Sequence, residues 1–273
     1  MYLYQILQRN QLFANKIISV NSDMSFAGIV SGNNVGEVWA NDLYNPDFCL
    51  VWSEHLECFQ FMGSRFNHIN KLDLQVFIRN TISKFLNDKE INFFEFACDS
   101  HEWLIYISSA LDNHEIKKSK QYVYKLNGEN TINTDLITPA GYDIFEVNEH
   151  FIKFKEIENC EILYSEIEKS WGTTDKFLDY AKCFVAVQSN KICSFALTTS
   201  LYKDIYSIYI ETFDPHKQKG LSSFLSMTLI NSIINQNATV WWDCMESNIA
   251  SQKTAQKVGL VFNHEYEVCW FDL

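Results

Sequence analysis

A short polar loop in the C-terminal half combines three features that suit the binding of a phosphate group. Residues 217–222 read Lys-Gln-Lys-Gly-Leu-Ser, and they join a predicted strand at 205–212 to a predicted helix at 221–234. The first N–H groups of a helix have no partner within the helix and lie at the positive end of its dipole. Gly220 lets the main chain approach an anion or adopt a positive φ, and two lysines add charge. The loop predicts a diphosphate cradle, and the alternative is a solvated turn whose glycine relaxes the start of the helix.

A second segment, about 30 residues further on, has the features of a strand that leads into a short helix. The strand is predicted at 239–244, and Ser247 or Asn248 can cap the helix that follows. Gly259 can end that helix in the left-handed conformation. One bent strand or a tight pair of strands is then predicted at 261–271.

Together the two segments resemble the signatures of the GNAT superfamily of N-acetyltransferases. The family's loop reads Arg/Gln-x-x-Gly-x-Gly/Ala, and this chain has Lys217-Gln-Lys-Gly220-Leu-Ser222, so Lys and Ser replace the outer residues. The family's second pattern, an Asn-led helix that ends in Lys-Leu-Gly-Phe, reads Asn248 … Lys257-Val-Gly259-Leu260. The resemblance covers roughly residues 142–273. It implies a mixed, mostly antiparallel, splayed sheet flanked by helices, and acetyl-CoA as cosubstrate.

The resemblance also implies which residues would hold that cosubstrate. The strand at 208–212 would part from the strand at 239–244, so that the pantetheine arm could pair with its main chain. Asn248 would contact the cofactor near the pantetheine, cap its helix, or do both. The implied cofactor-binding residues are Ile210, Glu211, Thr212, Lys217, Gln218, Lys219, Gly220, Leu221, Ser222 and Asn248.

Two carboxylates are candidates for the general base that direct attack of an amine on a thioester needs. Glu211 lies near the end of its strand, beside the expected splay, and Asp243 lies on the adjacent strand. The alternative roles are an exposed carboxylate at a strand end and a side chain bonded within the sheet. Many family members carry a Tyr as acid for the thiolate where this chain has Ala255, so either another group such as Tyr266 or a water serves, or protonation of the leaving thiolate matters little. Cys244 is more typical of core packing than of a nucleophile.

The elements that position these residues indicate an α/β protein of two domains. An N-terminal domain is predicted at 1–127, a linker at 128–141 and the acetyltransferase domain at 142–273. The first domain has no motif of its own. Its predicted helices lie at 1–20, 72–86 and 102–111 and its strands at 36–40, 48–62, 91–97 and 122–126, which is compatible with a degenerate copy of half the same fold. Such a copy could cover the substrate cleft or mediate a homodimer.

The charge and the cysteine and histidine content of the chain indicate which kinds of ligand are not expected. The net charge is −12 and the sequence pI about 5.0, so the basic face that grips nucleic acid is not expected. The eight cysteines form no CxxC pair and the histidines no ligand cluster, so reduced thiols and no metal are expected. We also expect no signal peptide, no membrane span and a cytoplasmic location.

These observations leave three hypotheses about function. The first is an acetyl-CoA-dependent N-acetyltransferase that acts on the amine of a small molecule. The second is a non-catalytic acyl-CoA-binding regulatory module, which Ala255 in place of the family Tyr allows. The third, a tandem acyltransferase that draws on charged transfer RNA, is disfavoured by the acidic charge.

Overall fold

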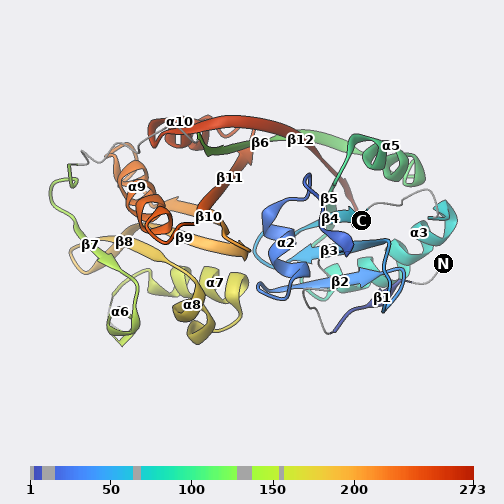
Figure 1. The fold of residues 1–273 in the computed structure, drawn as a ribbon, viewed down its shortest axis with the longest axis horizontal. Coiled ribbons are helices and arrows are strands. Elements are labelled where there is room, and N and C mark those ends of the chain that lie inside the picture. The colour runs from blue at the N-terminus through green and yellow to red at the C-terminus, as the bar shows by residue number, and fades with distance from the viewer. Residues whose placement is uncertain (1–2, 8–15, 64–68, 128–136, 154–156) are drawn as a thin grey trace. The chain divides into compact units, whose positions relative to one another are not determined.

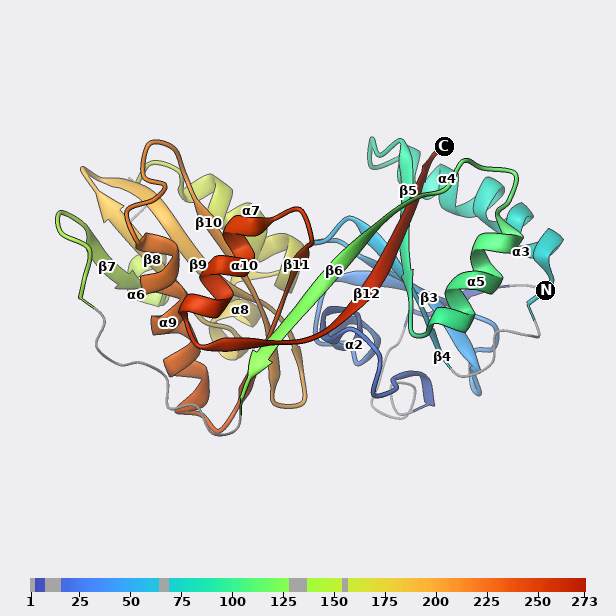
Figure 2. The same cartoon turned by 90° about the horizontal axis from the view of Figure 1, so that it is seen from above.

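The chain folds into two compact units in this computed structural model (Figures 1 and 2). The structure describes residues 3–7, 16–63, 69–127, 137–153 and 157–273. The first unit comprises Met1–Gln121 and Tyr266–Leu273, and the second comprises Tyr122–Glu265. The units therefore differ from the predicted domains, because residues 122–127 belong to the second unit and the last eight residues to the first. Most of the predicted linker, residues 128–136, lies outside the described residues.

The first unit contains a mostly antiparallel sheet. Its strands are β1 (Tyr4–Gln5), β2 (Gly36–Ala40), β3 (Phe48–Ser53), β4 (Cys58–Gly63), β5 (Phe93–Cys98) and the end of β12 (Leu260–Asp272). Strands β1 to β4 are antiparallel neighbours, β5 runs parallel to β4, and residues 268–272 of β12 pair antiparallel with β5. The parallel pair requires a long crossover, which a helical segment provides.

Helices cover both faces of this sheet. They are α2 (Met24–Val30), α3 (Lys71–Phe77), a π-helical turn η1 (Ile78–Ile82), α4 (Ser83–Asn87) and α5 (His101–Ala110). Strand β3 reads FCLVWS and is buried throughout. Phe48, Leu50 and Trp52 pack in one core cluster with α3 to α5, whereas Cys49 and Val51 pack in another with α2. A strand buried on both faces needs such a continuous apolar run.

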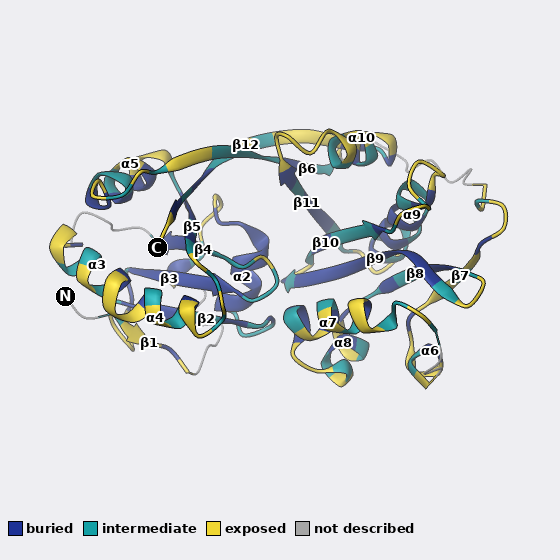
Figure 3. Ribbon diagram, turned by 180° about the vertical axis from the view of Figure 1, so that it is seen from behind, coloured by how far each residue is buried: buried dark blue, intermediate teal, exposed yellow. Residues whose placement is uncertain are grey.

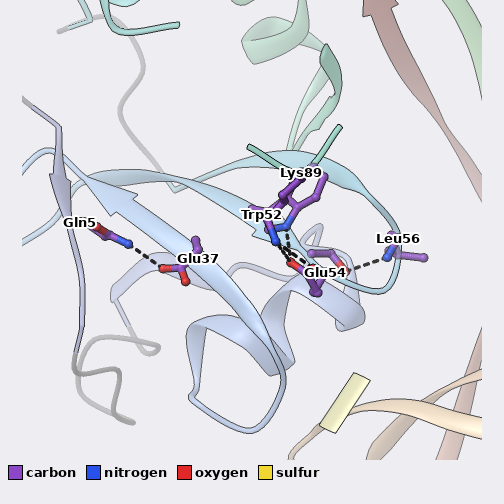
Figure 4. Close-up of polar contacts among 7 residues, drawn as sticks. Gln5, Glu37, Trp52, Glu54, Leu56 and Lys89 are labelled. Atoms are coloured by element: carbon purple, nitrogen blue, oxygen red, sulfur yellow. Dashed lines mark hydrogen bonds and ion pairs between the residues drawn. The ribbon is translucent and has the colours of Figure 1, made fainter. Parts of the chain in front are cut away.

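Side-chain hydrogen bonds and an ion pair link neighbouring strands and loops of this unit (Figure 4). Glu54, after β3, accepts from Trp52 Nε1 at 2.9 Å and forms an ion pair with Lys89 Nζ at 2.7 Å. Gln5 of β1 donates to Glu37 of β2 at 2.9 Å. The contacts at Glu54 join the hairpin that follows β3 to the loop after α4.

The second unit repeats the mostly antiparallel plan. Its strands are β6 (Lys117–Leu126, of which 122–126 belong here), β7 (Asp143–Glu146), β8 (Cys183–Gln188), β9 (Lys191–Tyr202), β10 (Ile205–Thr212), β11 (Thr239–Met245) and the start of β12. Strands β7 to β10 are antiparallel neighbours, β11 runs parallel to β10, and β6 lies next to β11. The residue types of Ser189-Asn190 predict a hairpin turn, and these residues take φ of 50° and 61° in the turn between β8 and β9.

Helices again lie on both faces of the sheet. They are α6 (Glu149–Lys153), α7 (Cys160–Trp171), α8 (Thr174–Tyr180), α9 (Leu221–Ile234) and α10 (Ile249–Lys257). Helices α6 to α8 contribute to one core cluster and α9 and α10 to the other. Strand β9, between these clusters, is buried along most of its length (Figure 3).

The fold class is the one predicted, a mixed α/β protein with a mostly antiparallel open sheet flanked by helices. The predicted helix at 1–20 is wrong at Tyr4–Gln5, which form β1 and pair with β2; residues 8–15 lie outside the described residues. The predicted strand at 48–62 is a hairpin of β3 and β4. Helix α2 has no counterpart in the prediction. The helices predicted for the second half lie at 149–155, 161–171, 221–234 and 248–258, so α8 has no counterpart either.

Candidate functional site

Two parallel strands of the second unit pair over only part of their length (Figure 1). Residues 205–207 of β10 pair with residues 239–241 of β11, whereas both strands run on well beyond these residues. The pairing of β10 with β9 shifts register between Ser207 and Ile208, where the pairing with β11 stops. Such a bulge bends a strand. Residues 208–212 therefore present an edge that β11 does not cover.

The main chain of β10 turns alternate peptide groups toward this open edge. Phe213 N–H donates to the Cys193 carbonyl at 3.0 Å, so every second residue back from Phe213 bonds to β9. Peptide groups alternate along an antiparallel pair, so those of Ile210 and Thr212 point away from β9. Glu211 Oε1 accepts from Thr212 N–H at 3.1 Å. Ile210 thus offers one donor and one acceptor to an extended ligand.

Helix α9 begins next to this edge with an open, uncapped end. Gly220 precedes the helix with φ of 81°, no side chain caps it, and its first turn holds no acidic residue. A Cβ built at Gly220 would meet nothing within 4 Å. Within the described part of the chain, the N–H groups of Leu221 and Ser222 have no acceptor. Unpaired amides at the positive end of a 14-residue helix suit a phosphate group.

The loop before α9 carries positive charge. Lys217 Nζ lies 3.1 Å from Asp214 Oδ2 in an exposed ion pair, which water weakens. His216 Nδ1 lies 2.9 Å from the Tyr142 hydroxyl. Desolvation lowers the pKa of His216, and the positive charge of Lys219 lowers it further. A neutral imidazole beside a cationic loop follows from both effects.

A chain of hydroxyl groups joins the end of β10 to the first turn of α9. Ser194 Oγ donates to the Glu211 carbonyl at 2.7 Å and lies 2.7 Å from Thr212 Oγ1, which lies 2.9 Å from Ser222 Oγ. Because the single proton of Ser194 goes to the carbonyl, Thr212 must donate to Ser194 and Ser222 to Thr212. The Ser that replaces the family's Gly or Ala is therefore accommodated by a directed hydrogen-bond chain.

The Glu211 side chain is held by two donors. Its Oε2 accepts from the Tyr209 hydroxyl at 3.1 Å, and its Oε1 accepts from Thr212 N–H at 3.1 Å. Tyr209 and Glu211 are two residues apart on β10, so they share one face of the strand. Both are half-buried. A carboxylate held in this way at the open edge can accept a proton.

Strand β11 carries the second predicted carboxylate beyond the paired residues. Asp243 is half-buried, between the buried Trp242 and Cys244. Desolvation raises the pKa of Cys244, and the negative charge of Asp243 adds to that effect. Cys244 therefore stays a thiol at neutral pH, which agrees with a packing role rather than a nucleophilic one.

Helix α10 shows the predicted cap but not the family's acid. Asn248 is exposed, and its Oδ1 accepts from Ser251 N–H at 3.0 Å. Ala255 is fully buried. Tyr266, the predicted substitute, lies in the first unit and donates to Asp23 Oδ2 at 3.3 Å. Another tyrosine, Tyr124 of β6, bonds to the α10 side chain of Gln256, and burial raises its pKa.

The first unit repeats the order of strand, crossover helix and parallel strand, but its described residues show neither a parting of β4 from β5 nor an uncapped start of α3. Parallel pairing of β4 with β5 is extended by Asp99 N–H, which donates to the Phe61 carbonyl at 3.1 Å. Asn70 Oδ1 caps α3 by accepting from two N–H groups, and Asp73 puts an acid in the first turn. In the described residues, β4 and β5 therefore stay paired where β10 and β11 part, and α3 has a side-chain cap and an acidic residue in its first turn where α9 has neither.

The structure brings some of the predicted residues together and separates others. Hydrogen bonds link Glu211, Thr212 and Ser222 into one network. Asp243 and Asn248 instead lie on β11 and at the start of α10. Tyr209 and Ser194 were not predicted, although the Tyr-x-Glu spacing on a strand already indicated that Tyr209 and Glu211 share a face.

Neither a metal centre nor a membrane helix is found in the part of the chain that the structure describes. His, Cys, Asp and Glu side chains of these residues form no group of three or more that could hold a metal ion. Their helices are too short or too polar to cross a bilayer.

Comparison with known proteins gives a match over nearly the whole chain. Residues 12–269 match the family described as GNAT acetyltransferase, while no curated protein matches significantly. The fold is similar to that of a GCN5-related N-acetyltransferase-like protein from Streptococcus suis, with a TM-score of 0.62, 15% identity, and coverage of 86% of this chain and 88% of that chain.

Two further solved structures are similar over both units. A tandem GNAT protein from the clavulanic acid biosynthesis pathway has a TM-score of 0.60 and 8% identity, with coverage of 99% of this chain and 98% of that chain. A GNAT-family acetyltransferase from Colwellia psychrerythraea has a TM-score of 0.51 and 13% identity, with 100% of each chain covered. At these identities the likeness is one of fold.

Proposed function

Because the chain belongs to the GNAT acetyltransferase family, we propose that it is an N-acetyltransferase that transfers an acetyl group from acetyl-CoA to the amine of a small molecule. Members of this family use acetyl-CoA as cosubstrate. The observation that carries the proposal is the uncapped start of α9 at Gly220, beside the open edge of β10. The net charge of −12 supports a small-molecule acceptor over nucleic acid.

The residues present fit that cosubstrate. The open space at Gly220 leaves room for a pyrophosphate against the main-chain N–H groups, where Lys217, Gln218 and Lys219 complete the loop. Ile210 would pair with the pantetheine amide, while Thr212 N–H is engaged by Glu211. These features support a single extended binding track along β10 and the start of α9.

Glu211 is the general base in this proposal. Acetyl-CoA, when bound, supplies the thioester whose carbonyl carbon the acceptor amine attacks. The Glu211 carboxylate would take the ammonium proton directly or through water, which leaves the nitrogen lone pair available. Asp243, on the strand that parts from β10, is the second candidate for this role. With Ala255 in place of the family Tyr, the thiolate would leave without a side-chain acid from α10.

Two glycine variants test the binding track. Gly220→Glu places a side chain and a negative charge in the cradle, whereas Gly259→Glu introduces the same residue at the end of α10. Both glycines have similar positive φ, 81° and 85°, and open space at Cβ, so the strain is matched. Bound ligand raises the melting temperature by mass action. We expect acetyl-CoA to raise that of the wild type and Gly259→Glu by several degrees and to leave Gly220→Glu unchanged. No shift in the wild type would refute the proposal.

A non-catalytic acyl-CoA-binding module is the second candidate, and the buried Ala255 is the observation that favours it. It requires a melting shift without release of coenzyme A thiol across a panel of primary amines. Under the enzymatic proposal, thiol is released and Glu211→Gln lowers the rate by about 10²-fold or more, which is typical of a lost general base. Glu211→Gln without effect on a measurable rate would exclude Glu211 as the base.

A further inference from the structure

We infer that Tyr209 is a positioning residue that orients the Glu211 carboxylate at the open edge of β10. The inference rests on the proposed function, in which Glu211 accepts the proton of the acceptor amine. It assigns Tyr209 no contact with the substrate. Its basis is the set of hydrogen bonds around Glu211 and the packing that fixes the Tyr209 ring.

Three donors fix Glu211 from different directions. The Tyr209 hydroxyl donates to Oε2 at 3.1 Å, Thr212 N–H donates to Oε1 at 3.1 Å, and Ser194 Oγ donates to the main-chain carbonyl at 2.7 Å. A carboxylate with a donor on each oxygen cannot rotate without breaking one of the bonds. Of the two donors to the carboxylate, Tyr209 is the one that a side-chain substitution can remove.

The Tyr209 ring is itself held in place. It packs in the core cluster that α7 and α8 cover, and its centroid lies 5.9 Å from that of the fully buried Phe195. The hydroxyl is therefore delivered to Glu211 by a ring with little freedom, which is the arrangement that a supporting residue of a reactive group needs.

The surroundings of Tyr209 keep its hydroxyl in the protonated form that a hydrogen-bond donor needs. Burial raises the pKa of the phenol well above its ordinary value, and the negative charges of Glu211 on β10 and Glu166 on α7 raise it further. The phenol is therefore protonated at neutral pH and can donate to the Glu211 carboxylate. The observed hydrogen bond from this phenol to Glu211 Oε2 is what assigns Tyr209 its positioning role.

Tyr209→Phe keeps the ring and removes only the hydroxyl, so it tests the inference directly. A hydrogen bond favours the ionised form of the carboxylate. Its loss should move the acidic limb of the pH profile of kcat/KM to higher pH by about 0.5 to 1 unit, and lower kcat/KM on the plateau by roughly tenfold, the size expected for one hydrogen bond to a charged group. A purely structural residue would leave the limb in place.

Tyr206→Phe is the matched control. Tyr206 lies on the same strand but contributes to the core cluster of α9 and α10 instead, so its variant should keep the wild-type limb. A double-mutant cycle adds a second readout: the effect of Tyr209→Phe on the rate should vanish in a Glu211→Gln background.

The assay is release of coenzyme A thiol from acetyl-CoA with the best acceptor of a panel of primary amines. A shifted limb in Tyr209→Phe, together with a non-additive cycle, is the expected result. If the wild type turns over but the acidic limb of Tyr209→Phe stays in place, this inference alone is overturned. The same holds if the effects of Tyr209→Phe and Glu211→Gln on the rate are additive. Thiol release by no amine overturns the proposed function and the inference with it.

Discussion

Asp99, at the end of β5 in the first unit, is a buried carboxylate with a clear expected effect on stability. Its oxygens accept from Ser22 Oγ at 3.0 Å, Gln60 Nε2 at 3.1 Å and Gly63 N–H at 3.1 Å. Burial nevertheless raises the pKa of Asp99 from 3.8 to about 6, and the negative charge of Asp23 makes a smaller contribution in the same direction. Desolvation of the ionised form therefore outweighs three hydrogen bonds to it.

The raised pKa makes Asp99 destabilising at neutral pH. The unfolded chain releases the proton near pH 4 and the folded chain near pH 6, so stability falls as the pH rises between these values. A shift of about two pH units corresponds to about 3 kcal/mol. Asp99 therefore makes no contribution to the free energy of unfolding below about pH 4, and it lowers that free energy by the full amount above about pH 6.

Asp99→Asn removes this dependence with little change of shape. The Asn amide can donate to Gln60 Oε1, which is buried without a partner among the described residues, once the Gln60 amide flips. We expect the unfolding free energy of Asp99→Asn, relative to that of the wild type, to rise by up to about 3 kcal/mol between pH 4 and pH 7. Urea unfolding at a series of pH values, followed by tryptophan fluorescence, measures the difference.

Asp88→Asn is the control for this experiment, because Asp88 is exposed in the same unit. Its profile should run parallel to that of the wild type. If the free-energy difference between Asp99→Asn and the wild type were the same at pH 4 and pH 7, the burial argument for Asp99 would be refuted.

Two further predictions concern the binding of coenzyme A. Thr212→Val removes the central hydroxyl between Ser194 and Ser222. The free energy of unfolding, measured in urea, should therefore fall by about 1–2 kcal/mol, and the affinity for coenzyme A, measured by calorimetric titration, should fall by roughly three- to tenfold. Wild-type values of both quantities would contradict this prediction. Because the counterpart site in the first unit is closed by Asp99, Asn70 and Asp73, titration with coenzyme A should saturate at one molecule per chain, and two sites would contradict that reasoning.

Local signals were sufficient where an element has a clear start and a regular pattern. Helix α9 has the predicted bounds because Gly220 marks its start and apolar residues recur along it as far as Ile234. The turn at Ser189 and Asn190 could be predicted because Ser and Asn are both common turn residues, and Asn tolerates positive φ. The strand parting at Ile208 followed from the resemblance to the family and agrees with the pairing observed.

Other elements depend on contacts that local patterns do not contain. Helix α2 reads MSFAGIV and is buried at every position, so it shows no amphipathic period. Tyr4–Gln5 form a strand because the edge of β2 is available to them, in spite of the helical spacing of their apolar neighbours. The pairing of residues 268–272 with β5 joins positions far apart in the sequence, which no motif indicated.

Strands β6 and β12 each contribute residues to both units, so no single cut of the chain separates two complete halves. A fragment that ends at residue 127 keeps β5 but loses residues 268–272, its partner strand. The complementary fragment loses residues 122–126, which lie next to β11. Each fragment would expose an unpaired edge prone to aggregation. Neither unit can therefore be obtained with its complete sheet by cutting the chain once, so measurements of ligand binding to this protein require the full chain.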